Sequence, residues 1–341
     1  MTVGSKTKSH SEEAGVSPVP VTMHAAAIDR FGGPEVLTLH TLPVPNADKG
    51  EVLIEIHTAG VGGWDADMRT GWWPGKHPGF PLVLGSDGSG RVAATGSHAK
   101  RFKIGDTVYA YSFANAKAGF YAEYVAVAEE KVALVPRGLS LDQAGAIPTT
   151  GLTALQGIDD ALEVKRDEAI IIHGASGGVG TLAVQFAKLR GARVLATASG
   201  EAGTALVRQL GADGAVDGRH GDIAAAVRSF ASDGADAVLG LVGGDGLELC
   251  LDALRSGGRL AYPNGIEPEP RKRRGIRFVP YDAVAGTREF TALGLAVEAA
   301  KLQVPIAARF PLAEAAKAHE RLAKGAVLGK ITLRTDRHKG D

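Results

Sequence analysis

The chain has 341 residues, which is enough for two domains with separate hydrophobic cores. Its 38 Lys and Arg side chains are balanced by 38 Asp and Glu side chains, so charge gives no reason to expect nucleic acid or an anionic membrane as a partner. One cysteine cannot form a disulfide framework or a multi-cysteine zinc lobe, and no apolar run is long enough to span a membrane, so we expect a cytoplasmic protein.

Two segments have a biased composition. Residues 1–22 are rich in Ser, Lys and Glu and lack the apolar core of a signal sequence, which predicts a disordered or artificially added tail. The folded chain is then expected to begin at Met23. The basic run Arg-Lys-Arg-Arg at 271–274 is predicted to be a solvated loop, with a phosphate-binding or nucleic-acid-binding patch as the alternative.

The first part of the chain, up to about residue 136, alternates short apolar segments with turns. Residues 51–57 alternate apolar and charged side chains, as a half-buried strand does. Residues 60–90 contain many glycines and several large aromatic side chains. This pattern is typical of a partly open antiparallel barrel. The predicted strands are 24–28, 36–42, 51–57, 90–94, 106–111 and 121–127.

From about residue 141 strands alternate with helices, which predicts a parallel, doubly wound sheet. A first helix is expected to end near residue 162. The predicted strands that follow are 169–173, 193–198, 215–216, 235–242, 259–262 and 275–279, with helices at 182–189, 201–211, 222–231 and 246–255. From residue 302 the pattern returns to that of the first part. It predicts a strand at 304–310, a helix at 312–324 and a strand at 329–333.

The turn after the predicted strand 169–173 is the most informative motif in the chain. It reads GASGGVG, and a helix and a second apolar strand follow it to complete a βαβ unit of about 30 residues. Gly174 permits a tight turn, and Gly180 lets the helix pack closely on the strand. Gly177 and Gly178 bring bare backbone close to a diphosphate at the start of the helix. The motif therefore predicts dinucleotide binding, with an ordinary glycine-rich turn of an α/β protein as the alternative.

Further motifs follow one another in a recognisable order along residues 23–335. They are Met23-His24-Ala25-Ala26, Ala59-Gly60-Val61 followed by Asp65, Pro81-Leu82-Val83-Leu84-Gly85, Phe102 followed by Gly105-Asp106-Thr107-Val108, Gly119-Phe120-Tyr121-Ala122-Glu123-Tyr124, Leu210-Gly211-Ala212-Asp213 and Gly329-Lys330-Ile331-Thr332-Leu333. Together with the glycine turn, they resemble the medium-chain dehydrogenase/reductase superfamily, specifically its zinc-free quinone oxidoreductase branch. The resemblance implies hydride transfer from a nicotinamide cofactor, usually NADPH, in a cleft between two domains.

The same resemblance implies an α/β fold with two domains. Residues 23–143 and 303–341 are expected to form a GroES-like β-barrel catalytic domain. Residues 144–302 are expected to form a Rossmann dinucleotide-binding domain with a doubly wound parallel sheet. The strand at 275–279 is expected at the edge of that sheet, and an unpaired edge favours a symmetric homodimer.

Residue identity predicts that the protein has no catalytic zinc. Zinc alcohol dehydrogenases of the resembled superfamily carry a Cys and a His-Glu pair at positions that match Gly62, Ser86 and Asp87 here. Catalytic zinc needs three protein ligands, whereas glycine has no donor atom and serine is a poor zinc ligand. His57 and His98 show no metal-binding spacing and are expected to be surface or strand residues rather than ligands. We therefore expect no metal ion and no Lewis acid in the site.

The end of the strand at 193–198 bears on the choice of cofactor. It lacks the acidic residue that a NAD enzyme uses for the ribose hydroxyls, and Ser199 can donate a hydrogen bond to a 2′-phosphate, so NADPH is expected. The resemblance places a Lys and a Tyr for the 2′-phosphate at positions that hold Gly203 and Gly218 here. Arg219 is expected to supply the missing charge, with a solvated surface as the alternative for this arginine.

The remaining cofactor residues follow from the resemblance and from the rule that ligands bind at the carboxyl ends of parallel strands. The glycine turn is expected to contact the diphosphate, and the loops near Thr150 and after the fourth and fifth strands to contact the nicotinamide half. A plain turn is the alternative for Gly243. The expected cofactor-binding residues are Thr150, Thr153, Ala175, Ser176, Gly177, Gly178, Val179, Ser199, Arg219, Val242, Gly243, Asn264, Gly265 and Lys330.

The expected substrate pocket departs most from the resembled family. Relatives commonly carry Asn at the position of Gly62 and Tyr at the positions of Asp67 and Trp73, so these three residues are expected to line the pocket. An aromatic wall would suit a flat, apolar acceptor such as a quinone, and the alternative assigns part of it to the barrel core. The wall is the set Trp64, Trp72, Trp73 and Phe80.

Hydride transfer to such an acceptor places negative charge on an oxygen atom, which N–H or O–H donors must stabilise. The sequence identifies no proton donor, and Asp65 is expected to order its loop rather than to take part in the chemistry. Three alternatives stay open. They are a reductase of α,β-unsaturated ketones or aldehydes, an NADPH-binding protein with little turnover and, more distantly, a zinc alcohol dehydrogenase.

Overall fold

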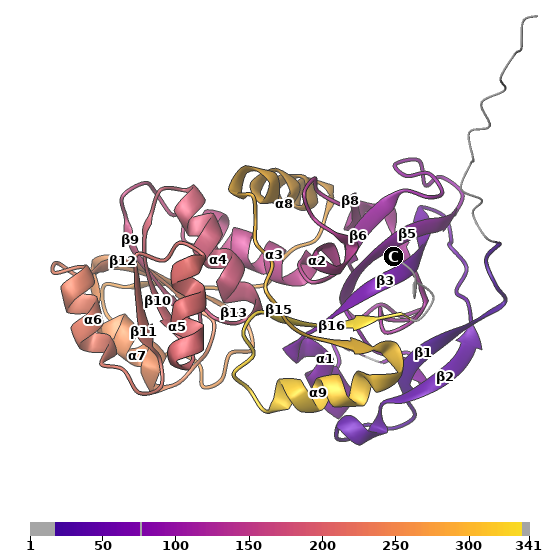
Figure 1. The fold of residues 1–341 in the computed structure, drawn as a ribbon, viewed down its shortest axis with the longest axis horizontal. Coiled ribbons are helices and arrows are strands. Elements are labelled where there is room, and N and C mark those ends of the chain that lie inside the picture. Colours follow the sequence, from indigo (N-terminus) through magenta and orange to yellow (C-terminus); the bar gives the residue numbers. More distant parts are fainter. Residues whose placement is uncertain (1–17, 76, 336–341) are drawn as a thin grey trace, which may run out of the picture.

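The structure is a computed structural model that describes residues 18–75 and 77–335. Two lobes lie side by side along the long axis of the molecule (Figure 1). One lobe contains both the start and the end of the described chain, and the other contains the strands between residues 169 and 281. Helices α2 (Leu141–Gly145) and α3 (Pro148–Gln156) lie between the lobes.

The first lobe is built on two sheets. Its strands are β1 (Thr22–Ile28), β2 (Thr38–Pro43), β3 (Glu51–Val61), β4 (Leu82–Val83), β5 (Asp87–Thr95), β6 (Thr107–Tyr111), β7 (Tyr124–Ala128), β8 (Val132–Leu134), β15 (Ile306–Pro311) and β16 (Lys330–Arg334). One sheet has the order β2-β1-β4, and the other has the order β15-β16-β3-β5-β6-β8, with β7 also paired to β3. The antiparallel pairing of β16 with β3 sets Ile331 opposite Val61, so the start of β16 lies at the end of β3.

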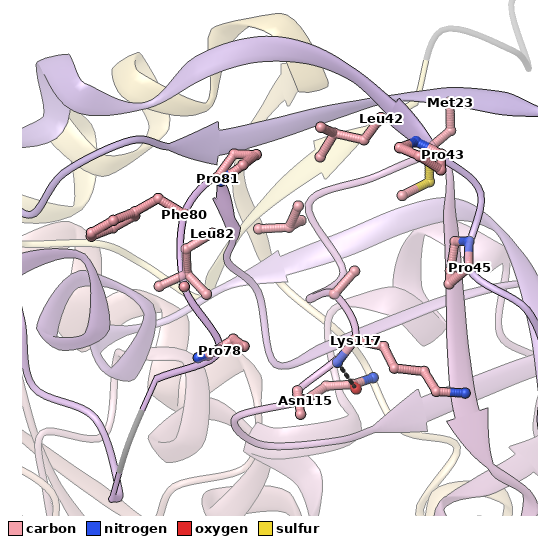
Figure 2. A pocket seen from close by; sticks show the side chains of 14 residues that line it. Met23, Leu42, Pro43, Pro45, Pro78, Phe80, Pro81, Leu82, Asn115 and Lys117 are labelled. Atoms are coloured by element: carbon pink, nitrogen blue, oxygen red, sulfur yellow. Dashed lines mark hydrogen bonds between the residues drawn. The ribbon is translucent and has the colours of Figure 1, made fainter.

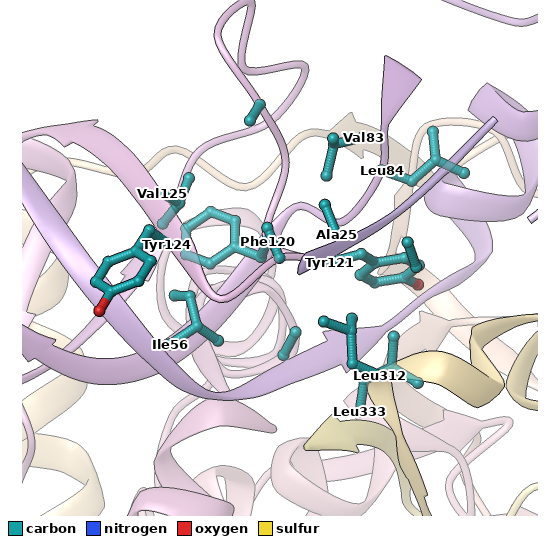
Figure 3. Packing of buried hydrophobic residues seen from close by; sticks show 14 of the residues in the cluster. Ala25, Ile56, Val83, Leu84, Phe120, Tyr121, Tyr124, Val125, Leu312 and Leu333 are labelled. Atoms are coloured by element: carbon teal, nitrogen blue, oxygen red, sulfur yellow. The ribbon is translucent and has the colours of Figure 1, made fainter. Parts of the chain in front are cut away.

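The core of the first lobe joins segments from both ends of the chain. Helices α1 (Gly63–Thr70) and α9 (Ala315–Ala323) belong to this lobe, and three short 3-10 helices cover Pro34–Val36, Glu129–Lys131 and Leu312–Glu314. Figure 3 shows the buried side chains Ala25, Ile56, Val83, Leu84, Phe120, Tyr121, Tyr124, Val125, Leu312 and Leu333. Because Leu312 and Leu333 pack among residues of β1 to β7, the C-terminal segment is part of this core.

The second lobe contains one parallel sheet. Its strands are β9 (Ala169–His173), β10 (Arg193–Ala198), β11 (Gly214–Asp217), β12 (Ala235–Gly240), β13 (Leu254–Pro263) and β14 (Arg277–Tyr281). They lie in the order β11-β10-β9-β12-β13-β14. All of β9 is buried, because helices cover both faces of the sheet. The strand order reverses between β9 and β12, and ligands bind at the carboxyl ends of strands at such a point.

Helices lie on both faces of this sheet. They are α4 (Gly178–Leu189), α5 (Gly200–Gln209), α6 (Ile223–Phe230), α7 (Asp245–Asp252) and α8 (Thr287–Ala300), and a π-helical turn at Gly157–Ala161 follows α3. Successive residues of β9 point to opposite faces. Ile170 and Ile172 pack in the cluster that contains α4 and α8, whereas Ile171 packs in the cluster that contains α6 and α7.

Several elements differ from those predicted. Helices α1 and α8 were not predicted, and the predicted strand at 36–42 begins instead as a 3-10 turn before β2. Strand β1 begins at Thr22, and the Val21 carbonyl accepts a hydrogen bond from the Val44 N–H. Ordered structure therefore begins before the predicted start at Met23. The rest of the predicted tail, residues 1–17, lies outside the described residues.

Candidate active site

The turn between β9 and α4 has the backbone that its glycines predict. Gly174 adopts a left-handed φ of +83°, which favours glycine. A Cβ atom on Gly180 would lie 2.5 Å from the Cα of Ala175, so glycine is required for α4 to start this close to the end of β9. The roles predicted for Gly174 and Gly180 are therefore confirmed.

The surface at the start of α4 is open. Gly177 is the N-cap of the helix, and no side chain caps the N–H groups of the first turn. A Cβ atom on Gly177 would meet only the carbonyl oxygen of Gly174, at 3.6 Å. Free N–H groups at the positive end of a helix bind anions, so the turn fits the diphosphate of a dinucleotide.

Backbone contacts join the glycine turn to the first lobe. The Gly329 N–H donates a hydrogen bond to the Ser176 carbonyl at 2.9 Å, and Gly177 and Gly329 form an isolated parallel bridge. The side chains of Ala175 and Ser176 are buried behind the turn. The Ser176 hydroxyl accepts a hydrogen bond from the Ser199 N–H at 3.1 Å. Both side chains therefore support the turn from behind.

Lys330 extends from this junction toward the loop that follows β3. A Cβ atom on Gly178 would lie 3.5 Å from its Cδ, one on Gly60 would lie 3.0 Å from its Cε, and one on Gly62 would lie 3.6 Å from its Nζ. The residue is only 7% exposed. Among the described residues, none forms a hydrogen bond or a close ion pair with the ammonium group. The side chain thus runs past Gly178 and Gly60 and ends beside Gly62.

Asp65 fixes the start of α1, whose N-cap is Gly62. One carboxylate oxygen accepts hydrogen bonds from the Gly62 N–H at 2.8 Å and the Tyr121 hydroxyl at 3.0 Å. The other oxygen accepts one from the Ser86 hydroxyl at 3.0 Å. Burial raises the pKa of Asp65 to about 6, and the charge of Lys330 opposes this rise. The prediction that Asp65 orders its loop is confirmed.

A buried hydrogen-bonded chain continues from Asp65 to α9. The Tyr121 hydroxyl donates a hydrogen bond to Asp65 and lies 3.0 Å from Nε2 of His319. This nitrogen therefore carries a hydrogen and donates a hydrogen bond to the Tyr121 oxygen. Burial, helped by Arg69, lowers the pKa of His319 to about 3 and keeps the ring neutral. The chain therefore ties the loop at Gly62 to the C-terminal helix.

Three aromatic side chains form a cluster near the start of α1. The ring centroids of Trp64 and Trp72 are 5.4 Å apart, and Phe113 lies 5.7 and 6.0 Å from them. A Cβ atom on Gly265 would lie 3.2 Å from Cη2 of Trp64, so the cluster meets the loop after β13. The sequence reading missed Phe113, although its place directly after β6 was the available signal.

The other members of the predicted aromatic wall lie elsewhere. Trp73 is half-buried against the barrel core, and Phe80 packs against Phe31 and His77 at centroid distances of 5.2 and 5.1 Å. For Trp73 the structure favours the alternative role in barrel packing, whereas Phe80 is 42% exposed and lies at the surface. Asp67 is exposed on α1, and partial burial of its carboxylate raises its pKa.

Two family models match the sequence. One, described as the alcohol dehydrogenase GroES-like domain, matches residues 48–137, and the other, described as zinc-binding dehydrogenase, matches residues 210–333. Quinone oxidoreductase of Homo sapiens is 32% identical over 324 residues, which cover 91% of this chain and 97% of the human protein. The chain belongs to the quinone oxidoreductase family of the medium-chain dehydrogenase/reductase superfamily.

Solved structures of related proteins share the fold. An NAD-dependent alcohol dehydrogenase superimposes with a TM-score of 0.85 and is 33% identical, over 92% of this chain and 99% of that protein. Quinone oxidoreductase of Escherichia coli, complexed with NADPH, superimposes with a TM-score of 0.80 and is 26% identical, over 91% of this chain and 99% of that protein. The predicted GroES-like barrel with a Rossmann sheet is confirmed. The protein is an oxidoreductase of this family that uses a nicotinamide cofactor.

The threonines of α3 donate their hydroxyl hydrogen bonds to backbone carbonyls one turn earlier in the chain. Thr150 donates to the Ala146 carbonyl at 2.9 Å, and Thr153 donates to the Thr149 carbonyl at 2.8 Å. The Thr149 N–H donates to Asp87 at 2.9 Å, which links α3 to β5. The helix is thereby held against the first lobe.

The loops after β12 and β13 contribute a mixture of surface and packing residues. Val242 is 53% exposed and borders the glycine turn. A Cβ atom on Gly243 would lie 2.5 Å from backbone carbonyl oxygens of residues 267 and 268, so this glycine is required for packing. The Asn264 side chain donates a hydrogen bond to Asp282 at 2.8 Å.

Asp217, at the end of β11, is a carboxylate that the sequence reading missed. It accepts hydrogen bonds from the N–H groups of Arg219 at 3.0 Å and Gly200 at 3.2 Å, and these bonds lower its pKa. The parallel register of β10 and β11 sets Asp217 beside Ala198, one residue before Ser199. Its place at the carboxyl end of a strand was the signal that marks it.

The hollow in Figure 2 lies in the first lobe, and Phe80 is the one member of the predicted aromatic wall among its lining residues. The hollow has a volume of about 330 Å³ and is bounded by β1, β2 and the segments 78–83 and 115–118. The ammonium of Lys117 at its rim forms ion pairs with Asp48 and Glu51. We assign this hollow no part in the reaction.

Residues 18–75 and 77–335 contain neither a candidate metal site nor a candidate membrane span. No group of three or more His, Cys, Asp or Glu side chains there is arranged to hold a metal ion. None of the helices in these ranges is long and apolar enough to cross a membrane.

Proposed function

We propose that the protein is an NADPH-dependent, zinc-independent reductase that transfers a hydride to a quinone or a similar electron-poor carbonyl compound. The observation that carries this proposal is the open glycine turn at the start of α4, joined by backbone to the barrel lobe that holds Gly62 and the aromatic cluster. The quinone oxidoreductases of the family support the same acceptor class.

Bound NADPH supplies the hydride from C4 of its nicotinamide ring. The protein's own part is to bind and orient the cofactor. The N–H groups of Gly178 and Val179 and the bare backbone of Gly177 are proposed to contact the diphosphate, supported from behind by Ala175 and Ser176. The residues proposed to border the nicotinamide half are Thr150, Thr153, Val242, Gly243, Asn264, Gly265 and the stem of Lys330.

Two features support NADPH over NADH. The end of β10 carries Ser199 and no carboxylate. The Arg219 side chain is exposed, so its charge is available to a 2′-phosphate. The related E. coli enzyme has been solved as a complex with NADPH.

Zinc-independent chemistry is supported by the side chains around Gly62. Gly62 has no donor atom, and the Ser86 hydroxyl donates its hydrogen bond to Asp65. The Lys330 ammonium already places a positive charge beside Gly62, which opposes the binding of a second cation. Elemental analysis of active protein that found one zinc ion per chain would overturn this part of the proposal.

The acceptor is proposed to bind between the start of α1 and the loop after β13. Trp64, Trp72 and Phe113 offer aromatic faces to a flat ring, and Gly62 leaves space beside them. We propose Asp67 as a residue at the rim of this pocket and Trp73 as its support from the barrel side.

Steady-state kinetics test the proposed function. With 1,4-naphthoquinone or 1,4-benzoquinone as acceptor, we expect kcat/KM for NADPH to exceed that for NADH by at least about tenfold. A clear advantage for NADH would refute the cofactor choice. Turnover of α,β-unsaturated ketones without quinone reduction would show that the acceptor is an enone rather than a quinone. Calorimetry that showed binding of neither nucleotide would overturn the whole proposal.

We further propose a homodimeric, cytoplasmic protein with two domains. Strand β14 lies at the end of the six-stranded sheet, and an unpaired edge favours symmetric pairing. Separate hydrophobic clusters support a division into 23–143 with 303–341, and 144–302. Sedimentation equilibrium that gave a monomer at micromolar concentration would contradict the dimer.

A further inference from the structure

The position of Lys330 follows from the pairing of two strands. The antiparallel register sets Ile331 opposite Val61, so the preceding residue on β16 comes opposite Gly62, the next residue after β3. Lys330 is therefore fixed at its backbone by the sheet of the first lobe. Its side chain lies along the junction between that sheet and the glycine turn.

The methylene groups and the ammonium group of the Lys330 side chain lie beside different parts of the junction. The Cδ atom lies nearest the glycine turn, at Gly178, whereas the Nζ atom lies nearest Gly62 at the start of α1. The methylene groups thus border the proposed cofactor site, and the ammonium has passed beyond it. It ends on the side of the junction where the acceptor is proposed to bind.

The absence of a side chain on Gly62 leaves room beside the ammonium for at least a methyl-sized group. A Cβ atom on Gly62 would have only two neighbours within 4 Å, Nζ of Lys330 at 3.6 Å and a carboxylate oxygen of Asp65 at 3.7 Å. Within the part of the chain that the structure describes, the ammonium forms no hydrogen bond, although Lys330 is 7% exposed. The Asp65 carboxylate offsets part of the charge, but a buried ammonium whose N–H groups lack an acceptor is unfavourable unless a ligand accepts from them.

We propose that the Lys330 ammonium donates a hydrogen bond to the carbonyl oxygen of the acceptor and stabilises the negative charge that forms there. This inference rests on the proposed function. When the hydride adds to an acceptor carbon, the electron pair of the π bond moves onto the oxygen, beside the ammonium. The ammonium keeps its proton, and water supplies the proton that completes the hydroxyl group. Lys330 thus provides the positive charge that a metal ion provides in zinc dehydrogenases.

Two substitutions of Lys330 test this role. Lys330→Met keeps the stem that packs along Gly60 and Gly178 but removes the charge, and Lys330→Arg keeps the charge. We expect Lys330→Met to lower kcat with 1,4-naphthoquinone about 100-fold and Lys330→Arg to recover at least about a tenth of wild-type turnover. The Kd for NADPH, measured by fluorescence, should stay within about threefold of wild type in both.

A second pair of variants tests the open space without touching the lysine. Gly62→Val fills the space in front of Nζ, and Gly62 has an extended φ of −130° that any residue adopts. Gly63→Val is the matched control, because a Cβ atom there meets nothing within 4 Å. We expect Gly62→Val to lower kcat/KM for the quinone at least about tenfold and Gly63→Val to leave it unchanged.

The outcomes separate this inference from the function on which it rests. If the wild type reduces quinones and Lys330→Met retains full turnover, the role of Lys330 is overturned and the reductase function stands. The same conclusion follows if the sole defect of Lys330→Met is weaker NADPH binding. The same holds if Gly62→Val turns over like the control. A wild-type protein that reduces no quinone would overturn both.

Discussion

Gly177 and Gly180 belong to the same turn and are glycine for opposite reasons. A Cβ atom on Gly180 would lie 2.5 Å from the Ala175 Cα, inside the packed junction of β9 and α4. Gly177 has φ of −81°, and a Cβ atom there meets only one oxygen, at 3.6 Å. Gly180 is therefore required for packing of the fold, whereas Gly177 leaves bare backbone on the proposed ligand surface.

A matched pair of alanine substitutions separates these roles. We expect Gly180→Ala to lower the free energy of unfolding by about 2–4 kcal/mol, because the added methyl group overlaps backbone atoms. Gly177→Ala should keep the stability of the wild type within about 0.5 kcal/mol but weaken NADPH binding at least about tenfold, because the methyl group occupies the place of the diphosphate. Urea unfolding and calorimetric titration measure the two effects. Equal loss of stability in both variants would contradict the distinction.

Asp65 makes the stability of the protein depend on pH. Its pKa is raised from 3.8 to about 6 in the folded chain, so the folded state binds its proton more tightly than the unfolded state does. The stability that this proton contributes is fully present below pH 3.8 and is lost as the pH rises through about 6.

The substitution Asp65→Asn removes this dependence. The amide also offers one acceptor oxygen where the carboxylate accepts three hydrogen bonds, so we expect a loss of about 1–3 kcal/mol. The difference in unfolding free energy between wild type and Asp65→Asn should be larger at about pH 5 than at about pH 8. Urea unfolding at both pH values measures it, with Asp233→Asn as the exposed control. Parallel pH profiles of wild type and Asp65→Asn would contradict the assignment.

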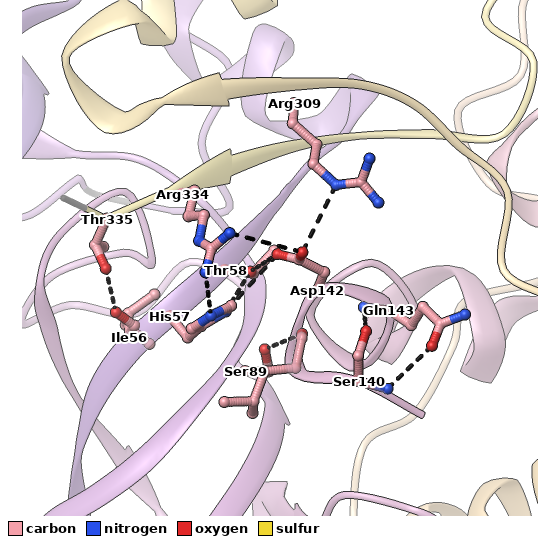
Figure 4. A network of polar contacts seen from close by, with 11 residues as sticks. Ile56, His57, Thr58, Ser89, Ser140, Asp142, Gln143, Arg309, Arg334 and Thr335 are labelled. Atoms are coloured by element: carbon pink, nitrogen blue, oxygen red, sulfur yellow. Dashed lines mark hydrogen bonds and ion pairs between the residues drawn. The ribbon is translucent and has the colours of Figure 1, made fainter. Parts of the chain in front are cut away.

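At the scale of elements, a polar network joins strands β3, β15 and β16 to α2 (Figure 4). Asp142 of α2 accepts a hydrogen bond from the Thr58 hydroxyl at 3.0 Å. Its other carboxylate oxygen lies 3.7 Å from Nε of Arg309 and 4.0 Å from a guanidinium nitrogen of Arg334. His57 lies in the same network, 3.1 Å from Arg334. The network therefore fixes the segment that leads from the barrel into the second lobe.

The variant Asp142→Ala tests the network. It removes the carboxylate that three elements share, so we expect the free energy of unfolding to fall by about 1–3 kcal/mol. Asp233→Ala is the control, because Asp233 is exposed and remote from this cluster in sequence. An unchanged urea midpoint for Asp142→Ala would show that the network contributes nothing to stability.

The elements also show which features the sequence made readable. Strands β9 and β10 were predicted to the residue and α4 was predicted to start four residues too late, because an apolar strand, a glycine turn and a helical repeat are local signals. Helix α1 was missed. The helix is short and its N-cap is a glycine. Asp65 in its first turn accepts a hydrogen bond from Tyr121, which is distant in the sequence. Helix α8 was also missed, although Phe290, Leu293 and Val297 follow a helical spacing.

At the scale of the molecule, one backbone bridge links the two lobes at the proposed cofactor site, between Gly177 and Gly329. This site exists only in the folded protein, so a bound cofactor favours the folded state over the unfolded state. NADPH at about 100 times its Kd should therefore stabilise the fold by about 2.7 kcal/mol and raise Tm by a few degrees. NADH at the same concentration should raise it less. Differential scanning calorimetry measures the shift, and an unchanged Tm with NADPH would contradict cofactor binding to the native state.

By itself the sequence determined the class of the fold, the family and the glycine turn between β9 and α4. Each of these depends on residues that are neighbours in the chain, where hydrophobic periodicity and the freedom of glycine act directly. Only the tertiary structure decided which aromatic rings meet the loop after β13 and that Asp65, Tyr121 and His319 form one buried chain. It also decided that Lys330 ends beside Gly62, because the register of β16 on β3 brings these positions together from distant parts of the chain.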